Sequence, residues 1–292
     1  MEHILAPRAE RVILAPSEVP RRDMALVLAI ANQKGGVGKT TTAVNLAASL
    51  AVSEQRALIV DLDPQGNATS GVGVAKDSTD QPSLYHALLG EAPARAAIRA
   101  TDVPGLFLLP GGPDLVGAEL ELVSVGERET RLRRALEPIR GDYEFVVIDC
   151  PPSLGLLTLN GLVAADRVLV PLQCEYYALE GLGSLLRTID LVRGSFNRDL
   201  LLEGVVLTMF DARNNLARQV MIDVQANLPG QVYATIIPRN VRLSEAPSHG
   251  RPALLYDIES KGAQSYLALA EELLRRRAAG VEVKARPRAR GQ

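Results

Sequence analysis

Residues 32–41, with the sequence NQKGGVGKTT, decide the fold of this chain. The apolar stretch 26–31 (LVLAIA) precedes them and is typical of a buried parallel strand. Apolar residues then recur at helical spacing in 42–52 (TAVNLAASLAV). A glycine-rich loop between a strand and a helix can direct its backbone N–H groups at phosphate oxygens. The sequence therefore predicts a phosphate-binding loop for a nucleoside triphosphate.

Two side chains of this loop have distinct chemical uses. Lys39 can place a positive charge on the phosphates, and the Thr40 hydroxyl can bind Mg²⁺. A standard loop of this type has glycine at the position of Gln33 and no counterpart of Lys34. Because one lysine is enough to hold the phosphates, Lys34 is expected to have another role. The nucleotide-binding residues predicted here are Lys34, Gly35, Gly36, Val37, Gly38, Lys39, Thr40 and Thr41.

The K-G-G-x-G-K-T-T form resembles the deviant Walker A loop of the ParA/MinD superfamily of ATPases. Segments 171–181 (PLQCEYYALEG) and 237–248 (IPRNVRLSEAPS) are similar to those of the Soj-type chromosome-partitioning ATPases, and the resemblance runs from about residue 26 to about residue 277. It implies ATP and Mg²⁺ as cofactors and a homodimer that forms around ATP. It also implies that Lys34 reaches the phosphates of the partner's nucleotide.

Acidic residues follow two other predicted strands, 57–60 (ALIV) and 145–148 (FVVI). Asp61 and Asp63 come after the first, and Asp149 comes after the second. Because ligands bind at the carboxyl ends of parallel strands, we expect these acids to converge on the loop. Asp61 and Asp149 are assigned to the Mg²⁺ shell together with Thr40. The resemblance implies that Asp63 positions the attacking water, so that Lys34, Lys39 and Asp63 serve catalysis; a simpler alternative is that Asp61 or Asp63 only caps the following turn.

Strand-like and helix-like stretches alternate along the chain, which predicts an α/β fold with a doubly wound, mostly parallel sheet and helices on both faces. The predicted strands are 26–31, 57–60, 106–109, 145–148, 167–170, 201–208 and 231–236, and the predicted helices are 42–52, 128–137, 178–193, 217–228 and 262–277. We expect one ATPase domain at 24–278, between a mobile extension at 1–23 and a basic, flexible tail at 279–292.

Composition fits a cytoplasmic protein, and the resemblance implies that it associates with the nucleoid. Of the 292 residues 47% are hydrophobic, yet every apolar run is shorter than a membrane span requires. No signal peptide is expected at the start of the sequence. Cys150 and Cys174 are predicted to be reduced, buried thiols; a metal cluster bridging two subunits is the alternative, although the two positions do not match the cysteines of the related nitrogenase iron protein.

The resemblance supplies the remaining site residues and partners. Pro238 and Asn240 are expected at the adenine base. Arg213 and Arg242 are expected to bind double-stranded DNA without sequence preference, and a ParB-type centromere-binding protein is the expected partner. With a net charge of −2 and a pI near 6.0, any DNA surface must be local. No arginine finger is evident in the loops, so hydrolysis should be slow without the partner.

Two other functions share the phosphate-binding loop. One is a MinD-like membrane-associated ATPase of the cell-division site, which ends in an amphipathic membrane helix. Apolar residues occupy one face of the predicted helix 262–277, but almost none follow Arg277, so no membrane association is expected. The other is a metabolic P-loop enzyme such as dethiobiotin synthetase, which the segments 63–67 (DPQGN) and 244–248 (SEAPS) argue against.

Overall fold

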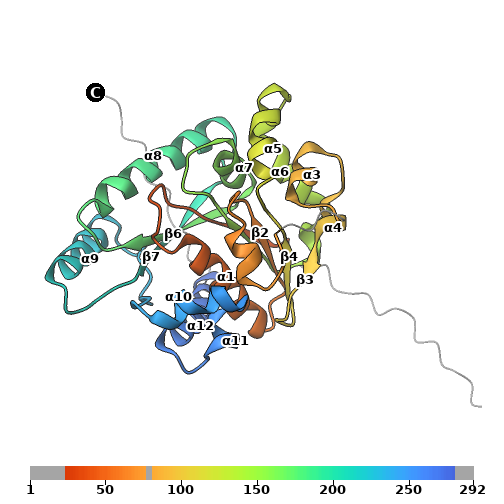
Figure 1. Cartoon of the computed structure of the whole chain (residues 1–292). Coiled ribbons are helices and arrows are strands. Elements are labelled where there is room, and N and C mark those ends of the chain that lie inside the picture. The colour runs from red at the N-terminus through yellow and green to blue at the C-terminus, as the bar shows by residue number, and fades with distance from the viewer. Residues whose placement is uncertain (1–23, 77–80, 280–292) are drawn as a thin grey trace, which may run out of the picture.

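The computed structural model describes residues 24–76 and 81–279, so the predicted extension at 1–23 and all but the first residue of the predicted tail lie outside the described residues. One seven-stranded sheet, in the order β3-β4-β2-β5-β1-β6-β7, forms the centre, and helices cover both of its faces (Figure 1). Every neighbouring pair of strands is parallel except β3 and β4. The predicted α/β fold with a doubly wound, mostly parallel sheet is confirmed.

The elements have the following bounds. The strands are β1 (Leu26–Ile30), β2 (Ala57–Asp61), β3 (Arg99–Ala100), β4 (Leu106–Leu109), β5 (Phe145–Asp149), β6 (Arg167–Gln173) and β7 (Leu201–Thr208). The helices are α1 (Lys39–Val52), α2 (Asn67–Gly71), α3 (Leu84–Leu89), α4 (Ala94–Ala97), α5 (Leu115–Glu121), α6 (Arg131–Leu136), α7 (Leu156–Ala164), α8 (Ala178–Ser195), α9 (Asn215–Asn227), α10 (Val241–Glu245), α11 (Ala253–Tyr256) and α12 (Lys261–Ala278). Short 3-10 turns lie at Leu122–Ser124, Arg128–Thr130, Glu137–Asp142 and Ala246–His249.

Two apolar cores lie on the opposite faces of the sheet. Alternate side chains of β1 enter different cores, with Val27 and Ala29 on one face and Leu28 and Ile30 on the other. The first core includes residues of α3 to α9, and the second includes residues of α1, α2 and α10 to α12 (Figure 1). Because both faces are covered, the central strands consist of unbroken apolar residues. This is why they could be located from the sequence.

The strand predicted at 231–236 is wrong. The backbone of Val205 in β7 accepts a hydrogen bond from Tyr233 N (2.9 Å) and donates one to Gln231 O (2.8 Å), so the segment begins alongside β7. The next two backbone N–H groups turn away and donate to the carboxylate of Glu272 on α12, at 2.9 and 2.8 Å. A side chain from a distant helix thus replaces the strand ladder, and this could not be inferred from local apolar pattern.

The single helix predicted at 128–137 is also wrong, because the segment is divided. A 3-10 turn at Arg128–Thr130 precedes α6, and a second 3-10 segment follows it at Glu137–Asp142. Pro138 lies in the first turn of the second segment, where its missing N–H cannot extend the helical hydrogen bonding of α6. The buried apolar residues here, Leu132 and Leu136 of α6 and Ile139 of the second 3-10 segment, therefore belong to two short elements rather than one helix.

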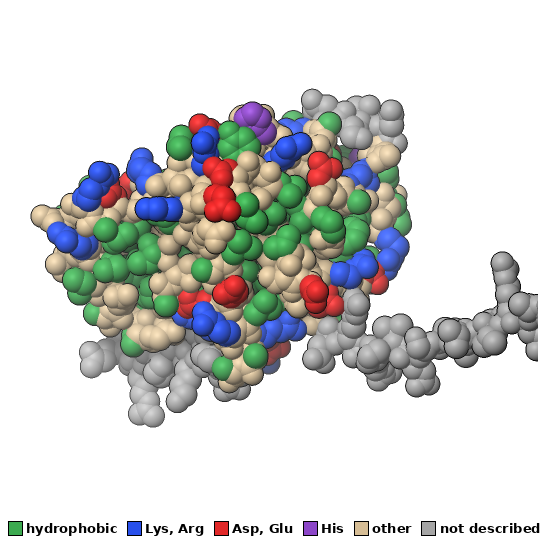
Figure 2. All heavy atoms as spheres, turned by 90° about the horizontal axis from the view of Figure 1, so that it is seen from below, with side chains coloured by type: hydrophobic (Ala, Val, Ile, Leu, Met, Phe, Trp, Pro, Cys, Tyr) green, Lys and Arg blue, Asp and Glu red, His purple; other side chains and the backbone are tan. Residues whose placement is uncertain are grey.

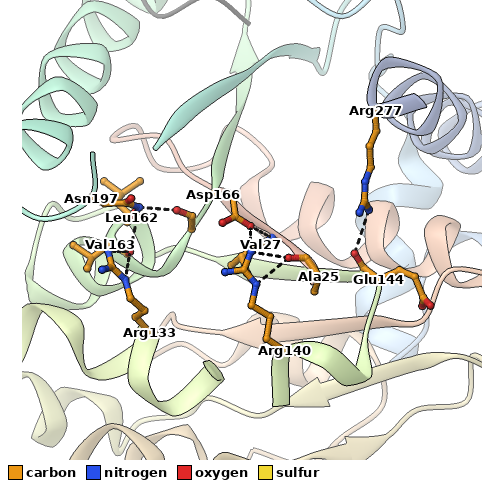
Figure 3. Close-up of polar contacts among 11 residues, drawn as sticks. Ala25, Val27, Arg133, Arg140, Glu144, Leu162, Val163, Asp166, Asn197 and Arg277 are labelled. Carbon is orange, nitrogen blue, oxygen red and sulfur yellow. Dashed lines mark hydrogen bonds and ion pairs between the residues drawn. The ribbon is translucent and has the colours of Figure 1, made fainter. Parts of the chain in front are cut away.

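At the edge of the sheet away from the phosphate-binding loop, polar contacts fix the start of β1 against β6 (Figure 3). The backbone N–H of Val27 donates to the carboxylate of Asp166 at 2.8 Å. The guanidinium of Arg140 bonds the same carboxylate at 2.5 Å and the carbonyl oxygen of Ala25 at 2.8 and 3.0 Å. These contacts hold the beginning of β1 in register with β6. The phosphate-binding loop, which follows the other end of β1, therefore has a fixed position relative to the sheet.

Candidate nucleotide-binding site

The loop after β1 closes into a turn that only glycine adopts readily. Gly36 and Gly38 have φ values of 73° and 88°, in the left-handed region. Gly38 caps α1, and its carbonyl oxygen accepts the Thr42 N–H at 2.8 Å. A Cβ added at Gly35 or Gly36 would meet no atom within 4 Å, so the concave side of the loop is open. This geometry fits an anion cradle made of backbone N–H groups and the α1 N-terminus.

Lys39 folds back over this loop. Its side chain is buried, and Nζ donates to the carbonyl oxygen of Lys34 at 3.0 Å. Burial lowers the pKa of Lys39, and the negative charges of Asp149 and Asp63 partly offset that effect. The ammonium group therefore lies among the two predicted acids and the loop, where a phosphate group would stabilise its charge.

Asp149 ends β5 beneath the loop, and its side chain is completely buried. Neither carboxylate oxygen has a hydrogen-bond partner that satisfies ordinary geometry. Burial and the neighbouring charge of Asp61 raise the pKa of Asp149 well above its usual range. A buried carboxylate without such a partner is costly unless a cation compensates it. Its place close to Lys39 and Thr40 fits an Mg²⁺ ion held mainly by nucleotide phosphates, which is how Mg²⁺ commonly binds.

The described residues contain no group of three or more histidine, cysteine, aspartate or glutamate side chains that could hold a metal ion by themselves.

Asp61 is the neighbour of Asp149 across the β2–β5 pair, so the predicted convergence of the two acidic strand ends is present. Its Oδ2 accepts the backbone N–H and the hydroxyl of Thr69, each at 2.7 Å, and its Oδ1 accepts Asp63 N at 3.3 Å. Burial nevertheless raises the pKa of Asp61 to about 6. Asp61 therefore organises the turn that leads to α2, and Oδ1, with its one long hydrogen bond, is the oxygen better placed to serve a metal shell.

Asp63 lies on the loop that follows β2 and lines the same cavity as the phosphate-binding loop. Its Oδ1 accepts Gln65 N at 2.9 Å, as in an Asx turn. Lys76 holds the next part of this loop, because its Nζ donates to Gln65 O at 2.6 Å. Both Asp61 and Asp63 thus cap turns, as the simpler alternative predicts, and Asp63 also faces the site.

A cavity of about 520 Å³ extends from the loop to the segment after residue 236, within the size range of small-molecule sites. Nine of the predicted residues line it: Gly35, Gly36, Gly38, Lys39, Thr40, Thr41, Asp63, Pro238 and Asn240. Val37 packs inward, and its carbonyl oxygen accepts the Thr208 hydroxyl at 2.8 Å. Asn240 caps α10 by accepting Arg242 N at 3.0 Å, which leaves its amide NH₂ group as a donor toward a base.

Other residues of the cavity wall were not predicted. Thr208 and Met209 come from the carboxyl end of β7, and Tyr266 comes from α12. The position of Thr208 at a strand end was a usable signal, since ligands gather at that edge. Met209 adopts a positive φ of 48°, which is uncommon for a residue other than glycine. The hydroxyl groups of Tyr266 and Thr42 form a hydrogen bond of 3.1 Å between α12 and α1. No pattern in the sequence predicts this contact.

Lys34 does not line the cavity. Its Nζ forms an ion pair with Glu175, in the loop between β6 and α8, and about 40% of its side chain is exposed. The two lysines of the loop are therefore separated in this structure, one buried over the cradle and one at the surface. This arrangement agrees with the expectation that only Lys39 serves the nucleotide of its own chain.

The predicted DNA-binding arginines lie outside the cavity, and both are paired with acids. Arg213 binds Asp211 through two hydrogen bonds of 2.8 and 2.9 Å, and Arg242 pairs with Glu245 at 2.9 Å and Asp257 at 3.1 Å. On the face shown in Figure 2, basic and acidic side chains of the described residues are interspersed and do not form one continuous basic patch.

Two further predictions concern cysteines and membranes. Cys150 and Cys174 are both buried and unpaired with each other, as predicted, and burial raises the pKa of both thiols, that of Cys174 to about 11. No helix in 24–76 or 81–279 has the length and apolar character needed to cross a bilayer.

Comparison with known proteins gives consistent results. A family model described as an AAA domain (AAA_31) matches residues 25–202. The chain is 58% identical over 250 residues to the chromosome partitioning protein ParA of Myxococcus xanthus, covering 86% of this chain and 88% of that one. It is 56% identical to the sporulation initiation inhibitor protein Soj of Bacillus subtilis, covering 86% and 98% of the two chains.

Solved structures share the same architecture. A structure named cobyrinic acid a,c-diamide synthase, from Mycobacterium smegmatis with a bound ATP analogue and magnesium, is 44% identical, with a TM-score of 0.76 and coverage of 88% of this chain and 97% of that one. The septum site-determining protein MinD of Pyrococcus horikoshii, complexed with Mg-ADP, is 25% identical, with a TM-score of 0.71 and coverage of 89% and 100%.

Proposed function

Because this chain belongs to the ParA/Soj family of chromosome-partitioning ATPases, we propose that it is an ATP-dependent switch that dimerises around ATP, binds DNA as a dimer and is released by hydrolysis. The observation that carries this proposal is the separation of the two loop lysines. Lys39 is buried over the cradle of its own chain, whereas Lys34 is directed to the surface, from which it can reach a second copy.

In the proposed site each group has a limited task. The loop N–H groups and Lys39 hold the phosphates, and Asn240 and Pro238 contact the base. Thr40 and Asp149 would hold Mg²⁺, with Asp61 contributing through its Oδ1. Mg²⁺, when bound, neutralises charge that develops on the phosphate oxygens. These groups position the nucleotide and neutralise its negative charge, and phosphoryl transfer requires little more than this from a protein.

Water activation is assigned to Asp63. It lines the cavity, and one of its carboxylate oxygens is fixed by Gln65 N, so that the carboxylate has a defined direction. The oriented Asp63 carboxylate can accept a hydrogen bond from a water molecule and align it for in-line attack on the phosphate. The remaining charge stabilisation is expected from a second copy and a ParB-type partner, since no arginine finger was identified in the sequence.

A metabolic role is the second candidate, favoured by the 44% identity to the structure named cobyrinic acid a,c-diamide synthase. Two relatives with higher identity, 58% and 56%, are named for chromosome partitioning and sporulation control. MinD of Pyrococcus horikoshii is more distant, at 25%. We therefore place the chain with the partitioning proteins.

Gel filtration with light scattering, with ATP and Mg²⁺ and without nucleotide, tests this proposal. The expected result is a dimer with ATP and a monomer without it, followed by binding of the dimer alone to two duplexes of unrelated sequence. ATP turnover should rise with DNA and not with corrinoid substrates. A monomer under both conditions, or turnover that depends on a metabolite, would contradict the proposal.

A further inference from the structure

The direction of the Lys34 side chain depends on one acid. The backbone of the loop is fixed separately, because the Asn32 side chain donates to Pro171 O at 2.8 Å and accepts Lys34 N at 3.0 Å. Beyond this anchored backbone, the Lys34 ammonium group meets the Glu175 carboxylate in an ion pair. Asn32 thus sets where the Lys34 side chain starts, and Glu175 sets where it ends.

Glu175 itself occupies a tight turn between β6 and α8. Its N–H donates to Gln173 O and its carbonyl oxygen accepts Ala178 N, both at 2.9 Å. The next two residues, Tyr176 and Tyr177, are 74% and 66% exposed. The ion pair therefore lies at the open surface, so that it can break without disturbing either core. It is also accessible to a second copy of the chain.

We propose that Glu175 is a positioning residue that holds Lys34 on its own chain before dimerisation, and that Lys34 leaves Glu175 when two ATP-loaded copies join. This inference rests on the proposed ATP-dependent dimer. If Lys34 approached the phosphates bound to a second copy while still paired with Glu175, the negative Glu175 carboxylate would come close to the negative phosphates. Exchange of the carboxylate for phosphate avoids that repulsion. Glu175 thereby opposes dimerisation until nucleotide offers a stronger partner.

The size of the effect follows from the exposure of the pair. Side chains that are 40% and 47% exposed form a weak ion pair, and two such pairs break in each dimer. Removing the Glu175 charge should therefore strengthen ATP-dependent dimerisation by about two- to thirtyfold. The gain should shrink at high salt, where the exposed pair is already screened.

The test compares Glu175→Gln with Glu180→Gln, which removes the same charge from an exposed position in the first turn of α8. Sedimentation at several ATP concentrations measures the dimer dissociation constant of each variant. Fluorescent ATP binding at high dilution measures the monomer, and thermal unfolding checks the fold. The expected result is tighter dimerisation in Glu175→Gln alone, with monomer ATP affinity unchanged.

A double variant separates positioning from a general effect on the surface. In a Lys34→Ala background, which is expected to stay monomeric with ATP, Glu175→Gln should not restore dimerisation, because its effect acts through Lys34. Unchanged or weaker dimerisation in Glu175→Gln, an equal gain in Glu180→Gln, or a gain that persists without Lys34 would each overturn this inference alone. A wild-type protein that stays monomeric with ATP would overturn the proposed function as well.

Discussion

At the scale of single residues, Lys39 and Lys34 have opposite surroundings although five positions separate them. Lys39 is buried and bonds within the loop, whereas Lys34 is exposed and paired with Glu175. Lys39→Ala should weaken ATP binding by about 1.5–3 kcal/mol, because a charged hydrogen-bonding group is lost from the phosphates.

Lys34→Ala should bind ATP as a monomer and fail to dimerise. Equilibrium binding and light scattering check both, and an ATP-dependent dimer of Lys34→Ala would contradict the division of roles.

Asp63→Ala separates chemistry from assembly. The Asp63 carboxylate lines the cavity, but its identified hydrogen bond is to the neighbouring Gln65 N, so its loss should leave nucleotide binding intact. We expect the variant to accumulate as an ATP-bound dimer while hydrolysis falls by about a hundredfold or more. Steady-state phosphate release and gel filtration measure the two effects. Parental turnover would move the role to Asp61 or Asp149.

The pairing of Arg213 with Asp211 gives the DNA-binding hypothesis a specific test. Two side-chain hydrogen bonds from Arg213 lower the pKa of Asp211 to about 2, so the acid is ionised throughout the neutral range. A phosphate that binds Arg213 must compete with this carboxylate. Asp211→Asn should therefore strengthen DNA binding by the dimer a few-fold, whereas Arg213→Ala should reduce the slope of log K against log salt by about 2 per dimer.

Binding isotherms at several salt concentrations, on two unrelated duplexes, provide the measurement. Arg242→Ala should have an effect similar to that of Arg213→Ala, with no change in sequence preference. Unchanged salt slopes in both arginine variants, with the dimer intact, would move the DNA surface elsewhere, with the basic residues Lys284, Arg286, Arg288 and Arg290 of the tail as the first positions to test.

At the scale of elements, α12 fixes the segment that leads to the base-binding residues. Glu272 on α12 accepts the N–H groups of Ala234 and Thr235 and pairs with Arg276 at 2.7 Å. The Arg276 guanidinium in turn lies 3.9 Å from the centre of the Tyr233 ring. The segment before Pro238 is thus attached to β7 at its start and, through Ile237 N to Leu207 O at 2.8 Å, at its end, and to α12 at its middle. These attachments determine where the segment meets the cavity.

Removing this attachment should destabilise the fold in a pH-dependent way. Burial would raise the pKa of Glu272, but hydrogen bonds from Ala234 and Thr235 and the charge of Arg276 outweigh it, and the net pKa is lowered from 4.5. An acid whose pKa is lowered by folding stabilises the folded state at pH values above its pKa in the unfolded chain. This contribution is lost as the pH falls through the lower pKa of the native state. Glu272→Ala should cost about 1–3 kcal/mol at pH 7, because two backbone donors lose their acceptor.

Urea unfolding at pH 7 and at pH 3 measures the difference. The cost of Glu272→Ala should be full at pH 7 and smaller at pH 3. Glu271→Ala is the matched control, since the neighbouring acid is exposed and its loss should change stability little. Equal costs at both pH values would show that the charge of Glu272 contributes nothing beyond its packing.

At the scale of the whole molecule, the site lies at one edge of the sheet and is completed by elements from across the chain. The loop after β1, the acids at the ends of β2 and β5 and the segment after β7 converge there. If a ParB-type partner docks at the seam between two copies, it can add positive charge beside the phosphates. Addition of DNA and a cognate ParB-type peptide should raise the ATPase rate several-fold; no increase with such peptides would count against partitioning.

The sequence by itself determined the fold class and most of the cradle. Strands β1, β2 and β5 are covered on both faces, so unbroken apolar runs marked them, and the spacing of glycines, Lys39 and Thr40 is a local requirement of phosphate binding. The place of the acids was also predictable, because the carboxyl ends of parallel strands meet at one edge. Local chemistry and strand order were sufficient for these features.

Only the tertiary structure decided the features that depend on distant segments. Glu272 stops residues 231–236 from completing a strand, Tyr266 reaches the cavity from α12, and Glu175 forms an ion pair with Lys34 outside that cavity. These contacts join positions that lie between 37 and 224 residues apart. Their physical reason is the packing of side chains across elements, which leaves no period or spacing in the sequence around either partner.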